Sequence, residues 1–215
     1  MDDIYQNVPI VSIVTDPKNL LDYDTGIYVK GTYYDKWIQT EDAKKWLDKR
    51  VDYGVTGNFT QKGREWERYA VIEYFENPST SSWIMNSGIR IKGGVSRLYG
   101  QKSFNVYFRK EYDGKLKYPL FSDAINTKQE VISKYKSITL RNGGNDTDRL
   151  KFKDAWIQSM VSDRHVDTQS SFMTVVFIME NIGVYIIFKK SILILILLLI
   201  ILFNLKMLLL LKREK

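Results

Sequence analysis

The sequence predicts a strand-rich α+β domain over residues 1–178, followed by an apolar, helix-like C-terminal tail over residues 179–215. Six short runs rich in β-branched and aromatic residues lie between clusters of Gly, Pro, Asn and Asp, which is typical of strands separated by turns. Helical periodicity is confined to a few segments and does not alternate regularly with the strands, so a parallel α/β architecture is not indicated. Between residues 192 and 211 the only polar side chains are Asn204 and Lys206.

The first third of the chain predicts one strand and a helical insertion. Residues 9–15, PIVSIVT, are compact and β-branched, which indicates a buried strand. The sequence DPKN then breaks the strand and is able to cap a short helical turn at residues 20–23. Residues 26–31 predict a short extended piece. The polar stretch 33–64 predicts a surface helix within a long insertion.

The remaining body predicts five more strands and one amphipathic helix. The strands are expected at residues 66–76, 89–92, 102–109, 135–141 and 172–178. The fifth of the six strands ends at NGGND, where Gly143 and Gly144 permit backbone angles closed to other residues. Residues 148–164 predict the helix, with Asp148 as a natural N-cap. Its apolar residues at helical spacing are Phe152, Trp156, Ile157, Met160 and Val161.

Composition excludes several classes of function. The formal net charge is +7, but residues 189–215 hold six Lys or Arg and one Glu, which leaves the body with 26 basic and 24 acidic residues. A body so nearly balanced does not indicate nucleic-acid binding. The chain has no cysteine and one histidine, His165, so neither a thiolate nor a multi-histidine metal site is expected, and a loop position is the default for His165. The N-terminus, MDDIYQNVPIVSIV, lacks the pattern of a signal peptide.

The stretch GIRIKGGVSRLYGQKSF is the first candidate binding motif. A glycine turn, Gly93-Gly94, lies near a lysine, Lys102, at the start of a strand, and Arg97 lies between them. Backbone N–H groups of such a turn and a nearby ammonium are able to hold nucleotide phosphates. The spacing matches neither of the common nucleotide-binding glycine loops. A β-hairpin carrying surface cations therefore remains the alternative interpretation.

The stretch LRNGGNDTDR is the second candidate motif. It places Asn142, Asn145 and Asp146 in a tight loop directly before the expected helix. Such side chains are able to bind a divalent ion or an anionic ligand. They also commonly cap helices and shape turns, and both interpretations stay open.

Seven segments in order resemble the CotH kinase family, named for a bacterial spore-coat protein. They cover about residues 8–178 and read PIVSIVTDPKNLLDYDTGIYVKG, WERYAVIEYFE, NSGIRIKGGVSRLYGQKSFNVYFRKEY, KYPLF, YKSITLRNGGNDTDRLKFKDAWIQSMV, VDTQ and VVFI. The resemblance implies an atypical protein-kinase-like fold that binds ATP with Mg²⁺ or Mn²⁺. It also implies serine phosphorylation of spore-coat or surface proteins, which would be the partners.

The resemblance also implies a role for each candidate residue. Lys102 becomes a phosphate-contacting lysine, with Arg97, Gly93 and Gly94 as its neighbours. Arg141, Asn142, Asn145 and Asp146 become a loop that marks the family. No catalytic residue and no metal ligand is assigned, because the family's catalytic and metal-binding aspartates belong to a second half that is absent after residue 178. The chain is therefore expected to be an incomplete, inactive kinase-like domain that does not bind ATP and metal productively.

The sequence after residue 178 fits a shifted reading frame of that family. The family pattern continues as INGEYWGIYNI, and in AT-rich codons the removal of one adenine turns it into IMENIGVYII, which is residues 178–187 letter for letter. AT-rich DNA read out of frame also yields mostly Ile, Leu, Phe, Lys and Asn, as in the rest of the tail.

The alternative is a membrane-anchored, non-catalytic coat or surface assembly protein. About twenty apolar residues at a rise of ~1.5 Å are long enough to cross the hydrocarbon core. Residues 190–211 are therefore a possible transmembrane segment, and a protein that carries it is expected at a membrane. Without the tail, a spore-coat or cytoplasmic location is expected.

Overall fold

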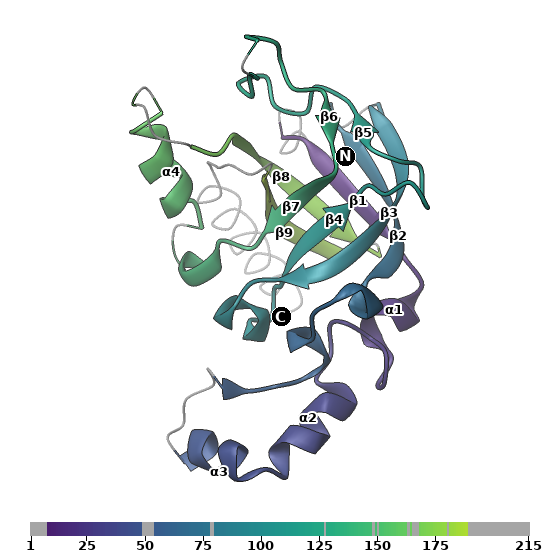
Figure 1. The fold of residues 1–215 in the computed structure, drawn as a ribbon, viewed down its shortest axis with the longest axis vertical. Helices are drawn as coiled ribbons and strands as arrows, with labels where there is room; N and C mark the ends of the chain where they lie inside the picture. The colour runs from purple at the N-terminus through teal and green to yellow at the C-terminus, as the bar shows by residue number, and fades with distance from the viewer. Residues whose placement is uncertain are drawn as a thin grey trace, which may run out of the picture.

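The computed structural model describes residues 8–48, 54–77, 80–126, 128–147, 149, 151–162, 164, 168–179 and 181–188. Over these residues the expected strand-rich α+β fold is confirmed: seven strands form one curled sheet that closes into a barrel (Figure 1). The barrel strands are β1 (Ile10–Val14), β2 (Arg68–Phe75), β3 (Trp83–Lys92), β4 (Ser103–Tyr107), β7 (Ser137–Arg141), β8 (Ser171–Ile178) and β9 (Asn181–Phe188).

Short elements surround the barrel. The helices are α1 (Pro17–Leu21), α2 (Gly31–Ile38), α3 (Glu41–Asp48) and α4 (Lys153–Ser159), and a small separate sheet pairs β5 (Leu116–Lys117) with β6 (Lys134–Tyr135). Single 3₁₀ turns occur at Asn58–Thr60, Arg64–Trp66, Val95–Leu98 and Gly144–Asp146. Helices α2 and α3 form an arm below the barrel in Figure 1, while α4 lies beside its opposite end.

One parallel pairing closes the barrel. Neighbouring strands in the order β1-β2-β3-β4-β7-β9-β8 pair antiparallel, and β8 then pairs in parallel with β1, with Ile13 opposite Ile178. The first strand of the described chain is thus held by one of its last strands. Because the barrel is closed, each of its strands pairs with a neighbouring strand on both sides, and the sheet has no open edge.

The core inside the barrel consists of the inward-facing side chains, which are every second residue along each strand. The fully buried members from the strands include Val11, Ile13, Ile72, Ile89, Phe104, Ile138 and Leu140. Aromatic rings pack together at one end, where Tyr74 stacks on Trp83 at a centroid distance of 5.5 Å and Phe121 contacts Phe172 at 5.3 Å.

All six strands expected before residue 179 are confirmed. Most boundaries differ by one or two residues, but β3 begins at Trp83, six residues earlier than expected. The cap after β1 is also confirmed, because Asp16 accepts a hydrogen bond from the backbone N–H of Lys18 at 2.8 Å. The helical turn expected at residues 20–23 lies earlier, since α1 begins at Pro17 and ends at Leu21. The expected extended piece at 26–31 is wrong. This segment bends back onto α1 through hydrogen bonds from Ile27 N–H to Asn19 and from Tyr28 N–H to Leu20, and Gly31 begins α2.

Two expectations for the second half need correction. The helix expected over residues 148–164 is shorter, because α4 covers only Lys153–Ser159, and its apolar residues Trp156, Ile157 and Met160 are exposed. The expected helix-like tail begins as a strand, since Asn181–Phe188 form β9 and complete the barrel. Asp148, His165 and residues 190–211 lie outside the described residues. Among the described residues, no helix is long and apolar enough to cross a membrane.

A buried carboxylate connects three parts of the barrel. Glu67, just before β2, accepts two hydrogen bonds of 2.7 Å from Arg109, and Arg90 of β3 lies 3.6 Å away. The Glu67 side chain is only 3% exposed. Since a buried charge without a partner is costly, this cluster specifies how the three segments meet.

We expect Glu67→Gln to lower the free energy of unfolding by about 3 kcal/mol, because it leaves two guanidinium groups beside a neutral amide. Urea denaturation measures the loss. The control is Glu41→Gln, which removes an exposed ion pair with Lys44 and is expected to cost less than about 1 kcal/mol. Equal losses for the two variants would contradict this role of Glu67.

Candidate functional site

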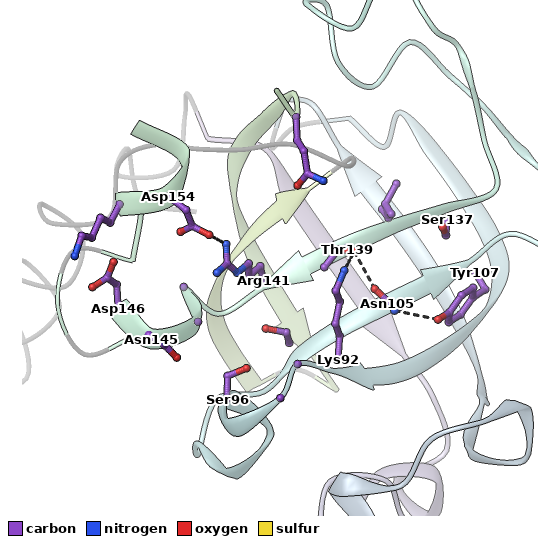
Figure 2. A pocket seen from close by; sticks show the side chains of 18 of the residues that line it. Lys92, Ser96, Asn105, Tyr107, Ser137, Thr139, Arg141, Asn145, Asp146 and Asp154 are labelled. Carbon is purple, nitrogen blue, oxygen red and sulfur yellow. Dashed lines mark hydrogen bonds and ion pairs between the residues drawn. The ribbon is translucent and has the colours of Figure 1, made fainter. Parts of the chain in front are cut away.

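An open cleft of about 1350 Å³ lies on the outer face of β3, β4 and β7 (Figure 2). Its floor consists of outward-facing polar residues of these strands, among them Asn105 and Thr139, whose side chains share a hydrogen bond of 2.8 Å. The glycine turn after β3 lines the cleft, and so do the loop after β7 and part of α4. Two segments that the sequence marked as candidate motifs therefore line the same cleft.

The turn after β3 brings a lysine and two glycines to the cleft. Lys92, the last residue of β3, donates a hydrogen bond to the Thr139 hydroxyl at 3.3 Å. Gly93 has a φ of +122°, and a Cβ at this position would lie 2.3 Å from the Ser96 hydroxyl, so the turn requires glycine. A Cβ at Gly94 would meet no atom within 4 Å. The cleft is therefore open over this part of the backbone.

The loop after β7 places a cation on the other side of the same cleft. Arg141 ends β7 and forms an ion pair with Asp154 of α4, as Figure 2 shows. Gly144 makes this arrangement possible, because a Cβ there would lie 2.5 Å from the Arg141 guanidinium. Asn145 and Asp146 line the cleft next to it. The loop thus positions one guanidinium and two polar side chains.

The cleft has an excess of positive charge. Among its described lining residues, the cations are Lys92, Lys134, Lys136, Arg141 and Lys153, and the carboxylates are Asp146 and Asp154. Partial desolvation of its ammonium, followed by the charge of Arg141, lowers the pKa of Lys92. Burial also lowers the pKa of Arg141, which the charge of Asp146 opposes. Because the charge of Arg141 disfavours the charged form of Lys92, an anion next to both groups would be favourable.

Lys102 and Arg97 face away from this cleft. The Lys102 ammonium is buried, and it donates to the carbonyl oxygens of Arg97 at 2.7 Å and Tyr99 at 2.9 Å. It also lies 4.4 Å from the Phe59 ring centroid. Arg97 donates to the Gly93 carbonyl at 2.7 Å and to two carbonyls in the segment 59–61. Both cations therefore hold the glycine turn in place from behind.

Asn142 is the buried anchor of the second loop. It accepts hydrogen bonds from the Ser103 hydroxyl and the Gly144 N–H, both at 2.9 Å, and donates to the Gln101 carbonyl at 2.6 Å. Of the eight candidate residues, the structure brings Gly93, Gly94, Arg141, Asn145 and Asp146 together around the cleft. It places Lys102, Arg97 and Asn142 in the supporting structure.

Lys92 is one of the cleft residues that the sequence interpretation missed. The signal was the alternation in IRIK, because Ile89 and Ile91 face the core and Lys92 must then face outward. The same rule puts Lys102 on the inward side, in phase with the buried Phe104 and Val106.

No group of three or more potential metal-ligating side chains occurs within the described part of the chain. In the cleft, Asp154 is engaged by Arg141, and Asp146 is the other carboxylate. These described residues do not form a site for a divalent ion on their own. The arrangement is better suited to an anion than to a cation.

Comparison with known proteins adds no assignment: no family model matches the chain, and no curated protein matches it.

The environment of Lys102 predicts a pH dependence of stability. Burial lowers its pKa from 10.5 to about 8. The unfolded chain therefore binds more protons than the folded chain between about pH 8 and pH 10, and Lys102 makes folding more favourable as pH rises through this window. The stability of the wild-type protein relative to Lys102→Met should increase by about 2 kcal/mol from pH 8 to pH 10, as measured by urea denaturation. Parallel pH profiles for the two proteins would contradict this environment.

Proposed function

We propose that this chain carries the nucleotide-binding part of a CotH-like atypical protein kinase, with the phosphates of ATP bound in the cleft beside Lys92. The substrate class that the family resemblance implies is a serine of a spore-coat or surface protein. The kinase-like fold and the family are parts of the same proposal.

One observation carries the proposal. The glycine turn and the NGGND loop are about fifty residues apart in the sequence, yet both line one cleft, together with Lys92 and Arg141. A glycine turn permits close approach of a ligand to the backbone, and two cations supply the charge that a polyphosphate requires. The cleft volume is sufficient for a nucleotide-sized ligand.

The role of each residue follows from its position. Lys92 acts as a point charge at the end of β3, and Arg141 offers the planar donor group that suits phosphate oxygens. Lys102 and Arg97 support the turn and do not touch the ligand. A divalent ion would enter with ATP and depend mainly on the phosphate oxygens, because Mg²⁺ commonly needs only one or two protein carboxylates.

A second candidate function is a non-catalytic assembly protein of the coat or cell surface. The observation that favours it is the apolar side of α4, where Trp156, Ile157 and Met160 are exposed. Exposed aromatic and Met side chains are enriched where proteins bind each other. The anchor through residues 190–211, which belongs to this alternative, lies outside the described residues.

We expect Lys92→Ala to weaken ATP binding about tenfold, because one charged hydrogen bond contributes about 1.5 kcal/mol or more. Isothermal titration calorimetry with ATP and Mg²⁺ measures the effect, which should shrink at high salt. Lys117→Ala is the matched control, since Lys117 is an exposed lysine of β5 outside the cleft lining. Equal affinity of the Lys92 variant and the wild-type protein would contradict a phosphate site in this cleft.

A second experiment measures phosphate transfer separately from ATP binding. The 215-residue chain, labelled ATP, Mg²⁺ or Mn²⁺ and a serine-rich coat protein should give no labelled product. The reason is that Asp154 is paired with Arg141 and that the described residues of the cleft include no carboxylate cluster able to hold two metal ions. Clear transfer of phosphate to serine would contradict this prediction and would favour a complete kinase.

A further inference from the structure

Arg141, one of the two cations of the proposed phosphate site, is paired with a carboxylate of the same cleft. Its Nη1 atom forms an ion pair with the side chain of Asp154, and Figure 2 shows these two groups pointing toward each other. Its Nη2 atom lies beside the backbone of the NGGND loop, because a Cβ at Gly144 would be 2.5 Å from it. A strong contact between an arginine and a phosphate uses two neighbouring N–H groups. Asp154 therefore engages a donor that the phosphate requires.

The two carboxylates of the cleft act on Arg141 in different ways. Within the described residues, the ion pair of Arg141 is with Asp154. Asp146, the other carboxylate of the described lining, acts through its charge, which opposes the lowering of the Arg141 pKa by burial. A nearby negative charge repels every anion in the cleft, whereas a paired carboxylate also occupies the atoms that the anion would contact. Asp154 and Asp146 thus have the same charge but a different relation to the guanidinium.

Asp154 is able to leave Arg141 at low cost. Its side chain is 37% exposed, so the carboxylate is able to turn into water. Ion pairs that are partly exposed contribute little to stability, because water and salt compete with them. A terminal phosphate carries a charge of roughly −1.5 to −2 at pH 7, against −1 on a carboxylate. A phosphate is therefore able to replace Asp154 on the guanidinium.

We propose that Asp154 is a built-in competitor of the ligand. Its carboxylate occupies the Arg141 donor that a phosphate of the ligand takes, and ligand binding exchanges one anion for the other. The affinity of the cleft is then set by this exchange as well as by the contacts with Lys92 and the glycine turn. The inference rests on the proposed function, because it concerns the regulation of the same phosphate site.

The exchange predicts two opposite effects for Asp154→Asn. The substitution removes an ion pair and the acidic residue in the first turn of α4, so the melting temperature should fall slightly. It also releases both outer nitrogens of Arg141 from the carboxylate, so the ligand should bind more tightly. If Asp154 only held α4 in place, the melting temperature would fall without any gain in affinity.

Isothermal titration calorimetry with inorganic triphosphate measures the gain in the 215-residue chain. Asp154→Asn should lower the dissociation constant about tenfold, because the charged contact with Arg141 forms without a competitor. The matched control is Asp146→Asn, which removes the same charge from the same cleft and leaves the ion pair in place. It should lower the dissociation constant no more than about threefold. Asp154→Ser removes the carboxylate with a different side chain and should give the same gain as Asp154→Asn.

A double-mutant cycle shows whether the gain depends on the guanidinium. When Arg141 is replaced in Arg141→Gln or Arg141→Met, adding Asp154→Asn should improve binding no more than adding Asp146→Asn does, because the competitor has lost its target. Circular dichroism verifies the fold of each variant.

The outcomes separate this inference from the proposed function. Equal gains for the two asparagine variants, or a gain that persists without Arg141, would overturn the competition and leave the phosphate site standing. Absence of triphosphate binding in the wild-type protein and in every variant would overturn the phosphate site, and the competition with it.

Discussion

The cleft depends on buried polar side chains that hold its two loops to the barrel. Asn142 is fully buried and joins the NGGND loop to β4 through Ser103, while Arg97 and Lys102 satisfy the backbone carbonyls around the glycine turn. Buried polar groups are tolerated only when they are paired, so these contacts allow few alternative loop conformations. The loops are therefore fixed in place without a ligand, which is the condition for binding a phosphate at low conformational cost.

The outer surface of the barrel has a polar face and an apolar face. Over β4 and β7 the outward residues are polar or charged and form the floor of the cleft, whereas on β8 the outward-facing Met173 and Val175 are apolar and buried. This division is visible because side chains alternate between the two faces of a strand and most of the inward positions are apolar. The proposed ligand belongs to the polar face.

The sequence predicted much of the fold because strand signals are local. The β-branched runs at residues 9–15 and 172–178 became β1 and β8, and Asp16 capped a helical turn as its chemistry indicated. The parallel pairing of β1 with β8 was not predictable from local pattern, since it joins segments more than 150 residues apart. The length of α4 was overestimated because helical spacing of Trp156 and Met160 says nothing about whether a partner is present. In the site, Arg141, Asn145 and Asp146 line the cleft, but Lys102 was chosen for its place near a glycine turn when strand alternation pointed to Lys92.

The central claim is that an anionic ligand binds between the glycine turn and the NGGND loop. Two-dimensional ¹H–¹⁵N NMR tests it most directly, because glycine amides report on each loop separately. Addition of inorganic triphosphate should shift the amide signals of Gly93, Gly94 and Gly144, while Gly114, which lies outside the cleft lining, stays unchanged. Unchanged signals for the loop glycines, or shifts confined to other parts of the barrel, would contradict the account.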